Sequence, residues 1–193
     1  MNYSAFIVLM VLLSTSSADD INDFDLSFVV SIDGCPQPVE IDGGLNLDRY
    51  LGKWYEIKRT NSLYEFDERC VITEYKLDSN DNVFVNISGI KEDNTDVWWG
   101  GSAEKGSLSN VFNATFIFYS PIAQYWIVDT DYDTYSLVVS CNNVNDLLYV
   151  KNAWILSRKP KLESDIVDSL VAKLETIGVG SANLRTTTQD CDN

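Results

Sequence analysis

Most of the chain alternates apolar and polar positions with a period of two, the pattern of a strand with one buried face. Val83, Val85 and Ile87, for example, share one face, while Asn86 and Ser88 lie on the other. The same pattern recurs along the chain and predicts eight strands, over residues 54–57, 70–77, 83–87, 96–103, 112–119, 124–129, 134–141 and 148–157.

Turns rich in Asp, Asn and Ser separate these expected strands, as in residues 78–82 and 129–133. Gly100 and Gly101, inside one expected strand, predict a bulge or a sharp bend there. Short strands at such regular spacing are typical of an antiparallel sandwich or barrel, so we expect an all-β fold.

One segment near the C-terminus has a helical period instead. Its apolar residues recur at i, i+3 and i+4, and they are Leu162, Ile166, Val167, Leu170, Val171, Leu174 and Ile177. Pro160 precedes the stripe, and Gly178 can end it. The pattern therefore predicts a single C-terminal α-helix over residues 162–177, packed on the outside of the strands.

The first eighteen residues, 1–18, have the pattern of a secretory signal peptide. An apolar run over residues 5–13 is followed by the small residues Ser16 and Ala18, at the positions that precede a cleavage site. The run is too short to span a bilayer, which takes about 20 residues, and no other segment reaches that length. No Lys or Arg precedes the run, so a buried N-terminal strand is the alternative. We expect a secreted, extracellular protein.

Residues 19–34 form an acidic N-terminal extension, because the first basic residue of the chain is Arg49. We expect this extension to be a mobile, solvated tail. The second interpretation, which its apolar residues 28–30 allow, is that it lies across the domain. The net charge of −15, from 29 acidic and 14 basic residues, argues against binding to nucleic acid or to anionic membrane surfaces. The folded domain is expected to span residues 35–193.

The chain contains no histidine, which excludes Ser-His-Asp and Cys-His catalysis and any His-ligated metal site. Four widely spaced cysteines in a secreted chain indicate two disulfides, but their spacing leaves three pairings open. No pair of carboxylates is placed for acid–base work. We therefore expect neither an enzyme nor a metal or catalytic cofactor.

Three short motifs narrow the fold. Residues 52–54 match a G-x-W signature, residues 130–132 match a T-D-Y signature, and Arg158 follows the last expected strand. In this order, with a helix after them, they resemble the lipocalin family, and in particular apolipoprotein D, Lazarillo and the invertebrate bilin-binding lipocalins. The resemblance covers residues 35–191. It implies an eight-stranded antiparallel up-and-down β-barrel with the helix packed outside.

The same resemblance implies roles for individual residues. Cys35 would pair with Cys141 and Cys70 with Cys191, and Arg158 would stack on Trp54 to close one end of the barrel. The resemblance also favours a ligand cavity over a solid core, an alternative that alternation alone leaves open. The inner residues expected to line this cavity are Tyr75, Val85, Ile87, Trp99, Phe116, Phe118, Tyr125, Val150, Asn152 and Trp154.

Two N-glycosylation sequons begin at Asn86 and Asn113. Both asparagines fall on the polar, outward side of their expected strands, so we expect a glycan on each.

Together these features predict a secreted carrier of a small hydrophobic molecule: a bilin such as biliverdin, a retinoid, a sterol-like lipid or a fatty acid. The alternative is a Lazarillo-like extracellular or cell-surface interaction protein, which would bind a receptor through the barrel rim and the acidic extension. In that case ligand carriage would be secondary. A visible absorption band or an extractable lipid in the purified protein would distinguish the carrier from the interaction protein.

Overall fold

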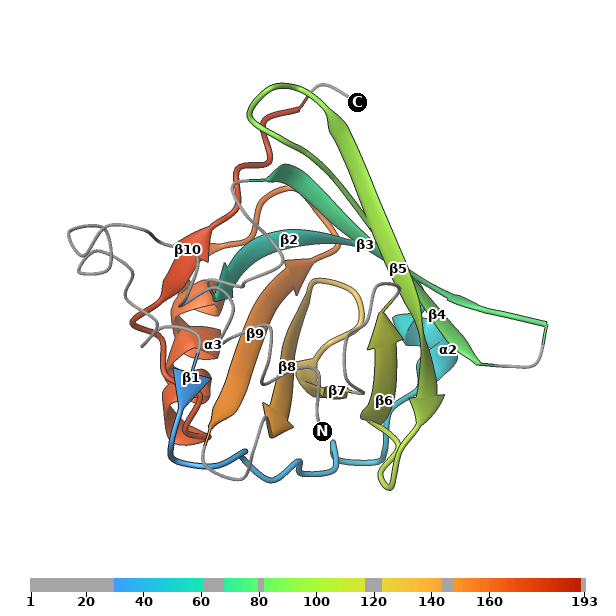
Figure 1. The fold of residues 1–193 in the computed structure, drawn as a ribbon, viewed down its shortest axis with the longest axis vertical. Helices are drawn as coiled ribbons and strands as arrows, with labels where there is room; N and C mark the ends of the chain where they lie inside the picture. Colours follow the sequence, from blue (N-terminus) through green and yellow to red (C-terminus); the bar gives the residue numbers. More distant parts are fainter. Residues whose placement is uncertain (1–29, 61–67, 80–81, 117–122, 144–147, 192–193) are drawn as a thin grey trace, which may run out of the picture.

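The computed structural model describes residues 30–60, 68–79, 82–116, 123–143 and 148–191. The expected signal peptide and most of the acidic extension lie outside these residues. Eight long strands form a closed antiparallel barrel in which each strand pairs with its neighbours in sequence, and β9 pairs with β2 to complete the ring (Figure 1). They are β2 (Gly52–Thr60), β3 (Arg69–Leu77), β4 (Val83–Ile90), β5 (Asp96–Lys105), β6 (Val111–Phe116), β7 (Ala123–Thr130), β8 (Tyr135–Asn143) and β9 (Tyr149–Ser157).

Two helices accompany the described part of the barrel. The helix α3 (Ser164–Thr176) lies within the segment that the apolar stripe predicts. The short helix α2 (Leu47–Tyr50) was not expected from the sequence. It begins after Asn46, whose side-chain oxygen accepts a hydrogen bond of 3.1 Å from the backbone N–H of Arg49. This helix places Tyr50 inside the barrel.

Two short strands extend the sheet beyond the barrel. Strand β1 (Val30–Ser31) pairs with Val150 and Tyr149 of β9. The described end of the acidic extension therefore lies along the domain, which supports the second interpretation of that segment. Strand β10 (Leu184–Thr186) pairs with β2 at Lys58–Thr60.

The C-terminal segment fills the gap where β2 and β3 separate. The ladder between these strands ends at Tyr55 and Ile72. Beyond it, the side-chain amide of Gln189 donates hydrogen bonds to the carbonyl oxygens of Glu56 (2.9 Å) and Val71 (2.8 Å). The C-terminal segment thus satisfies backbone acceptors that the neighbouring strand would otherwise have met.

Both disulfides implied by the resemblance are formed, Cys35–Cys141 and Cys70–Cys191. The first ties the segment before the barrel to β8, and the second ties the C-terminal segment to the start of β3. They join residues 106 and 121 positions apart. Cross-links over such long loops each stabilise a fold by about 2–4 kcal/mol.

Two groups of apolar side chains stabilise the barrel, one on each side of its wall. The outer group lies between α3 and the strands, and it includes Val167, Leu170 and Leu174 of the helix packed with Trp126 and Ile155. Figure 1 shows α3 on the β9 side, away from β4 and β5. The inner group fills part of the barrel and forms the candidate site described below.

The expected bulge at Gly100 and Gly101 is wrong. Both glycines pair with β4 in an unbroken register, opposite Asn86 and Val85. A Cβ on Gly100 would lie 2.8 Å from the carbonyl oxygen of Val85 and 3.2 Å from Cζ of Phe84. Gly100 therefore makes room for the neighbouring strand and for the Phe84 ring.

The strand register shifts elsewhere, as in β2 between Glu56 and Lys58.

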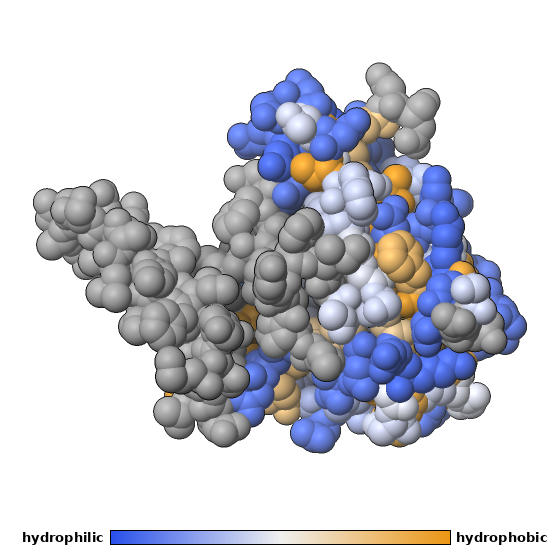
Figure 2. All heavy atoms as spheres, turned by 45° about the vertical axis from the view of Figure 1, so that its right-hand side comes forward, coloured by the Kyte–Doolittle hydropathy of each residue, from blue (hydrophilic) through white to orange (hydrophobic). Residues whose placement is uncertain are grey.

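The face that Figure 2 brings forward is mostly hydrophilic, with apolar residues scattered among the charged ones. Within the described ranges, no helix has the length and apolar character needed to cross a membrane.

Candidate ligand-binding site

The closed end of the barrel is built around Trp54, whose side chain is 0 % exposed. The guanidinium carbon of Arg158 lies 3.6 Å from the centroid of the Trp54 ring. The same guanidinium donates hydrogen bonds to the carbonyl oxygens of Lys53 (2.8 Å), Arg49 (2.9 Å) and Tyr132 (2.9 Å). A cation held on an aromatic face and satisfied by backbone oxygens closes this end, as the resemblance implies.

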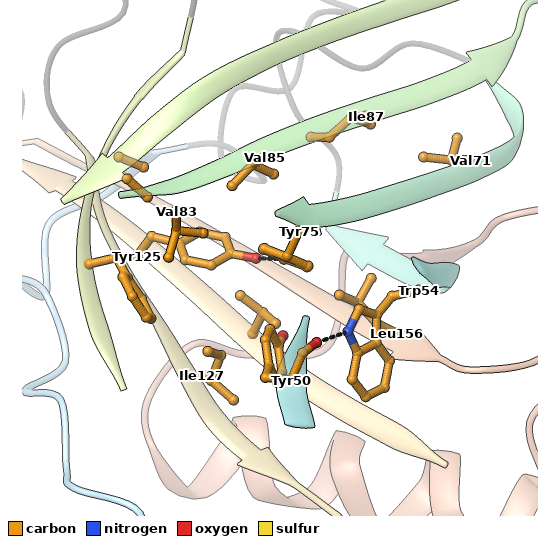
Figure 3. Close-up of a cluster of buried hydrophobic side chains, with 14 residues drawn as sticks. Tyr50, Trp54, Val71, Tyr75, Val83, Val85, Ile87, Tyr125, Ile127 and Leu156 are labelled. Carbon is orange, nitrogen blue, oxygen red and sulfur yellow. Dashed lines mark hydrogen bonds between the residues drawn. The ribbon is translucent and has the colours of Figure 1, made fainter. Parts of the chain in front are cut away.

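A chain of tyrosines crosses the barrel above this closed end (Figure 3). The hydroxyl groups of Tyr75 on β3 and Tyr125 on β7 are hydrogen-bonded to each other. These strands face each other across the eight-stranded ring. The Tyr50 ring lies 5.1 Å from the Tyr75 ring and 5.2 Å from the Trp54 ring, and its hydroxyl group is 2.9 Å from Oγ of Ser136. The tyrosines thus form a hydrogen-bonded floor inside the barrel.

Burial raises the pKa of both Tyr50 and Tyr75 well above the ordinary value of 10.0. A second contribution comes from the neighbouring phenol, which is Tyr75 for Tyr50 and Tyr125 for Tyr75, because two adjacent phenolates would repel each other. Both hydroxyl groups are therefore neutral hydrogen-bonding groups at physiological pH.

These raised pKa values predict a loss of stability in alkali. The unfolded chain releases the two phenol protons near pH 10, while the folded chain retains them, so the free energy of unfolding should fall as pH rises above about 10. Replacing Tyr50 or Tyr75 with phenylalanine should make that fall shallower. Urea unfolding at several alkaline pH values measures the slope. An unchanged slope in both variants would contradict buried, neutral phenol groups.

The half of the barrel below this floor is almost filled by side chains. It contains a cavity of about 10 Å³, counted as the space open to the centre of a water molecule. That is room for about one water. The residues around it are Leu47, Tyr50, Tyr75, Val83, Val85, Ala103, Phe112, Tyr125 and Ile127. This cavity is therefore too small for any ligand larger than a water molecule.

The wall of the open-end half is aromatic and polar. Trp99 of β5 and Trp154 of β9 are half-buried and pack against the inner group, and the Trp154 ring lies 6.0 Å from the Tyr125 ring. Asn142 is four residues after Val138 on β8, and Asn152 is two residues before Trp154 on β9. Because Val138 and Trp154 belong to the inner group, the period of two places both asparagines at inward positions. Their Oδ1 atoms are shielded from solvent and have no hydrogen-bond partner in the described structure.

A buried group of charges also lies at inward positions of β2. Arg59 is 0 % exposed and Glu56 is 1 % exposed. The Nε atom of Arg59 lies 3.7 Å from Oε1 of Glu56, and an Nη atom lies 3.3 Å from Oε2 of Glu68. Glu56 also accepts a hydrogen bond from the hydroxyl group of Thr187. This cluster links β2, the start of β3 and the C-terminal segment.

The structure brings together most of the inner residues expected from the sequence. Tyr75, Val85, Ile87 and Tyr125 are buried in the inner group, and Trp99 and Trp154 border it. Val150 and Asn152 are half-buried and lie farther toward the open end. Phe116 belongs to β6, but its side chain lies outside the described structure, as does the whole of Phe118. Their contact with a ligand stays a prediction.

Some inner residues were missed by sequence reasoning. Val83, Ala103 and Phe112 belong to the inner group. They continue the period-two alternation of the predicted inner residues, so extending that alternation along each strand would have found them. Tyr50 lies before the first expected strand, and no strand pattern points to it. Strict alternation from Trp54 places Arg59 on the outer face of β2, so sequence reasoning missed it, as discussed below.

The comparisons agree with this geometry. The model of the lipocalin-like domain family matches residues 45–189. The chain belongs to the lipocalin family. This lipocalin is 32% identical to apolipoprotein D of Mus musculus over 157 residues, which cover 80% of the chain and 82% of the relative. It is 33% identical to the Lazarillo protein of Schistocerca americana over 130 residues, covering 65% and 60% of the two chains.

Solved structures show the same fold. The structure of H1 crustacyanin from the lobster Homarus americanus superposes on this lipocalin with a TM-score of 0.70 at 25% sequence identity. The superposition covers 86% of this chain and 93% of the other. The barrel with its outer C-terminal helix is therefore an arrangement that this lipocalin shares with a solved structure.

Proposed function

We propose that this lipocalin binds one small hydrophobic molecule in the open-end half of its barrel and transports it outside the cell. The observation that carries the proposal is the pair of half-buried indoles, Trp99 and Trp154, on the inner wall above the tyrosine floor. An aromatic wall with a sealed floor is typical of a pocket for a small apolar ligand, because it removes the ligand surface from water.

The polar groups of the same half favour a ligand that carries O–H or N–H groups. A shielded acceptor without a partner costs about 1–3 kcal/mol, and a ligand that donates to Oδ1 of Asn142 or Asn152 would remove that cost. Biliverdin offers N–H groups and retinol offers an O–H group. Among the expected ligand classes, bilins, retinoids and sterol-like lipids carry such a donor, whereas a fatty acid that is ionised at neutral pH does not.

Secretion is part of the proposal. The two disulfides support it, because such cross-links persist in oxidising compartments. We propose that residues 1–18 are removed as a signal peptide, that residues 19–34 form an extension, and that residues 35–193 form the lipocalin domain. We also propose glycans on Asn86 and Asn113.

Two neighbouring tryptophans allow a matched test of the pocket. Trp99 faces the interior, while Trp98 is 70 % exposed on the outside of the same strand. Replacing Trp99 with alanine should weaken ligand binding about ten- to a hundredfold, the usual loss for a central aromatic contact. Replacing Trp98 should leave binding unchanged. Titration with biliverdin, retinol and arachidonic acid, followed by the quenching of tryptophan emission, measures the affinity.

Saturable one-to-one binding of at least one probe, weakened only by Trp99→Ala, is the result that the carrier proposal requires. Circular dichroism of each variant establishes that the barrel is folded. If none of the three probes binds the unmodified protein, the interaction-protein alternative becomes the better hypothesis. Equal losses in the two variants would place the ligand outside the barrel.

A further inference from the structure

The outer face of β4 and β5 exposes two large aromatic side chains. Trp98 is 70 % exposed, and Phe84 is 37 % exposed. The helix α3 packs on the opposite part of the barrel and leaves this face open (Figure 1). In Figure 2, where this side is turned forward, apolar residues lie among hydrophilic ones. Exposed aromatic groups on a sheet face that none of the described helices and strands covers indicate a surface that another group occupies.

Asn86 lies between these two aromatic residues. In the register of β4 with β5, Asn86 is opposite Gly100, and Ser88 is opposite Trp98. Trp98 is therefore a diagonal neighbour of Asn86 on the same face, at a separation that an aromatic side chain can bridge. The inward residues on either side of Asn86, Val85 and Ile87, are buried, so Asn86 points outward.

On its other side, Asn86 is bordered by the Phe84 ring. Cζ of Phe84 lies 3.2 Å from the position that a Cβ of Gly100 would take, so the ring extends over the glycine opposite Asn86. Because Gly100 has no side chain, the Phe84 ring can extend across it next to Asn86, and Trp98 is the diagonal neighbour of Asn86 on the other side. Asn86 also begins the sequon completed by Ile87 and Ser88.

We propose that the first sugar of an N-glycan on Asn86 packs against Trp98 and Phe84 and covers this face of the barrel. A pyranose ring presents a face of C–H groups, which packs favourably on an aromatic face by dispersion and by attraction to its negative π surface. The inference rests on the secretion proposed above, and it is independent of whether the barrel carries a ligand.

The surroundings of the patch favour a glycan over a protein partner. Across β3, Glu74 is opposite Asn86 and forms an ion pair of 2.8 Å with Lys76. Ser88 and Ser102 are the other outward neighbours on β4 and β5. Two aromatic side chains inside a polar border are too small for a stable protein interface, which buries at least about 1,000 Å². A covalently attached sugar needs no such area, because its attachment already holds it beside the rings.

Asn113 provides an internal control. It is exposed on the same side of the wall, but Glu104 and Gln124 lie opposite it on the adjacent strands. Its diagonal neighbour Trp126 is only 2 % exposed, so the described strands offer a glycan at Asn113 no comparable aromatic surface. We expect the two glycans to differ: the one on Asn86 is ordered and stabilising, and the one on Asn113 is neutral.

The test uses the chain secreted from eukaryotic cells, with intact-mass spectrometry to establish which sequons are occupied. Ser88→Ala removes the first sequon and keeps Asn86, while Thr115→Ala does the same for Asn113. Trp98→Ser removes the main aromatic surface. Thermal unfolding is then measured for each variant and for the two double variants with Trp98→Ser. The same proteins refolded from bacteria, which lack glycans, measure the direct effect of each substitution.

In the glycosylated protein, Ser88→Ala should lower Tm by about 2–4 °C when Trp98 is present and by much less in the Trp98→Ser background. Thr115→Ala should show no such dependence on Trp98, and the bacterial proteins should show none at either site. Trimming the glycan to a single N-acetylglucosamine should preserve Tm, and protons of that sugar should show nuclear Overhauser contacts to the Trp98 ring.

Two results would overturn the inference. One is a secreted protein whose Asn86 carries no glycan. The other is an occupied Asn86 whose loss changes Tm equally with and without Trp98. Neither result bears on the binding of a ligand inside the barrel, which is tested separately by Trp99→Ala.

Discussion

Replacing Trp54 with alanine should lower the free energy of unfolding by about 3–5 kcal/mol, the range measured for large buried aromatic side chains. The indole is fully buried at the closed end, and its Nε1 donates a hydrogen bond of 2.9 Å to the carbonyl oxygen of Tyr50. Its loss would leave a cavity beside Tyr50 and remove the aromatic face on which Arg158 rests. Trp54 therefore contributes a hydrogen bond, a ring contact with Tyr50 and the stack with Arg158 at the closed end.

Urea unfolding followed by circular dichroism measures this effect without relying on tryptophan emission. Trp98→Ala, measured in the protein without glycans, is the matched control, because the same residue type is removed from an exposed position, where changes are usually within about 0.5 kcal/mol. Trp54→Phe should lie between them, since it retains most of the packing and loses the Nε1 hydrogen bond. A loss below about 1 kcal/mol in Trp54→Ala would show that the closed end is not built around this indole.

Replacing Arg59 with methionine should have an effect of similar size, about 3–5 kcal/mol, for a different reason. Methionine fills much of the same volume but carries no charge. The carboxylates of Glu56 and Glu68, both buried, would then lose the cation that faces them at 3.7 Å and 3.3 Å. Removing one member of a buried ionic group is costly because the remaining charges stay out of water.

A triple variant separates charge from packing at this site. Adding Glu56→Gln and Glu68→Gln to Arg59→Met removes the two negative charges while the amides keep similar shapes. The triple variant should recover at least half of the stability that the single variant loses. If it is no more stable than Arg59→Met alone, lost packing explains the effect, and the charges are not the reason.

The two ends of the barrel differ in the side chains that they place inside it. The closed end combines the Arg158–Trp54 pair with a tyrosine floor, and its cavity holds about one water molecule. The open-end half carries the half-buried indoles and the unpartnered asparagine oxygens. The proposed function therefore assigns stability and binding to different residues, and the variants Trp54→Ala and Trp99→Ala should separate the two effects.

Local patterns in the sequence were enough to predict the barrel strands, the C-terminal helix and the family, but not the short elements α2, β1 and β10. Period-two alternation predicts every barrel strand because each strand has one face toward the interior, and that rule needs no knowledge of its partners. The helix follows from its apolar stripe in the same way: residues 162–177 were expected, and Ser164–Thr176 are helical. The G-x-W, T-D-Y and arginine motifs are also local, and together they indicated the lipocalin barrel and, by resemblance, the disulfide pairing.

What the sequence could not supply depends on contacts between strands. Strict alternation from Trp54 places Lys58 inside and Arg59 outside, but the bulge of β2 between Glu56 and Lys58 reverses this parity and buries Arg59 opposite Trp154. A bulge arises from how two strands pair, so one strand alone does not reveal it. The same holds for Tyr75 and Tyr125, which are 50 positions apart and meet only because the sheet closes. The sequence by itself determined the barrel and its inward face, and only the tertiary structure decided which inner side chains form the floor and how little space remains beneath it.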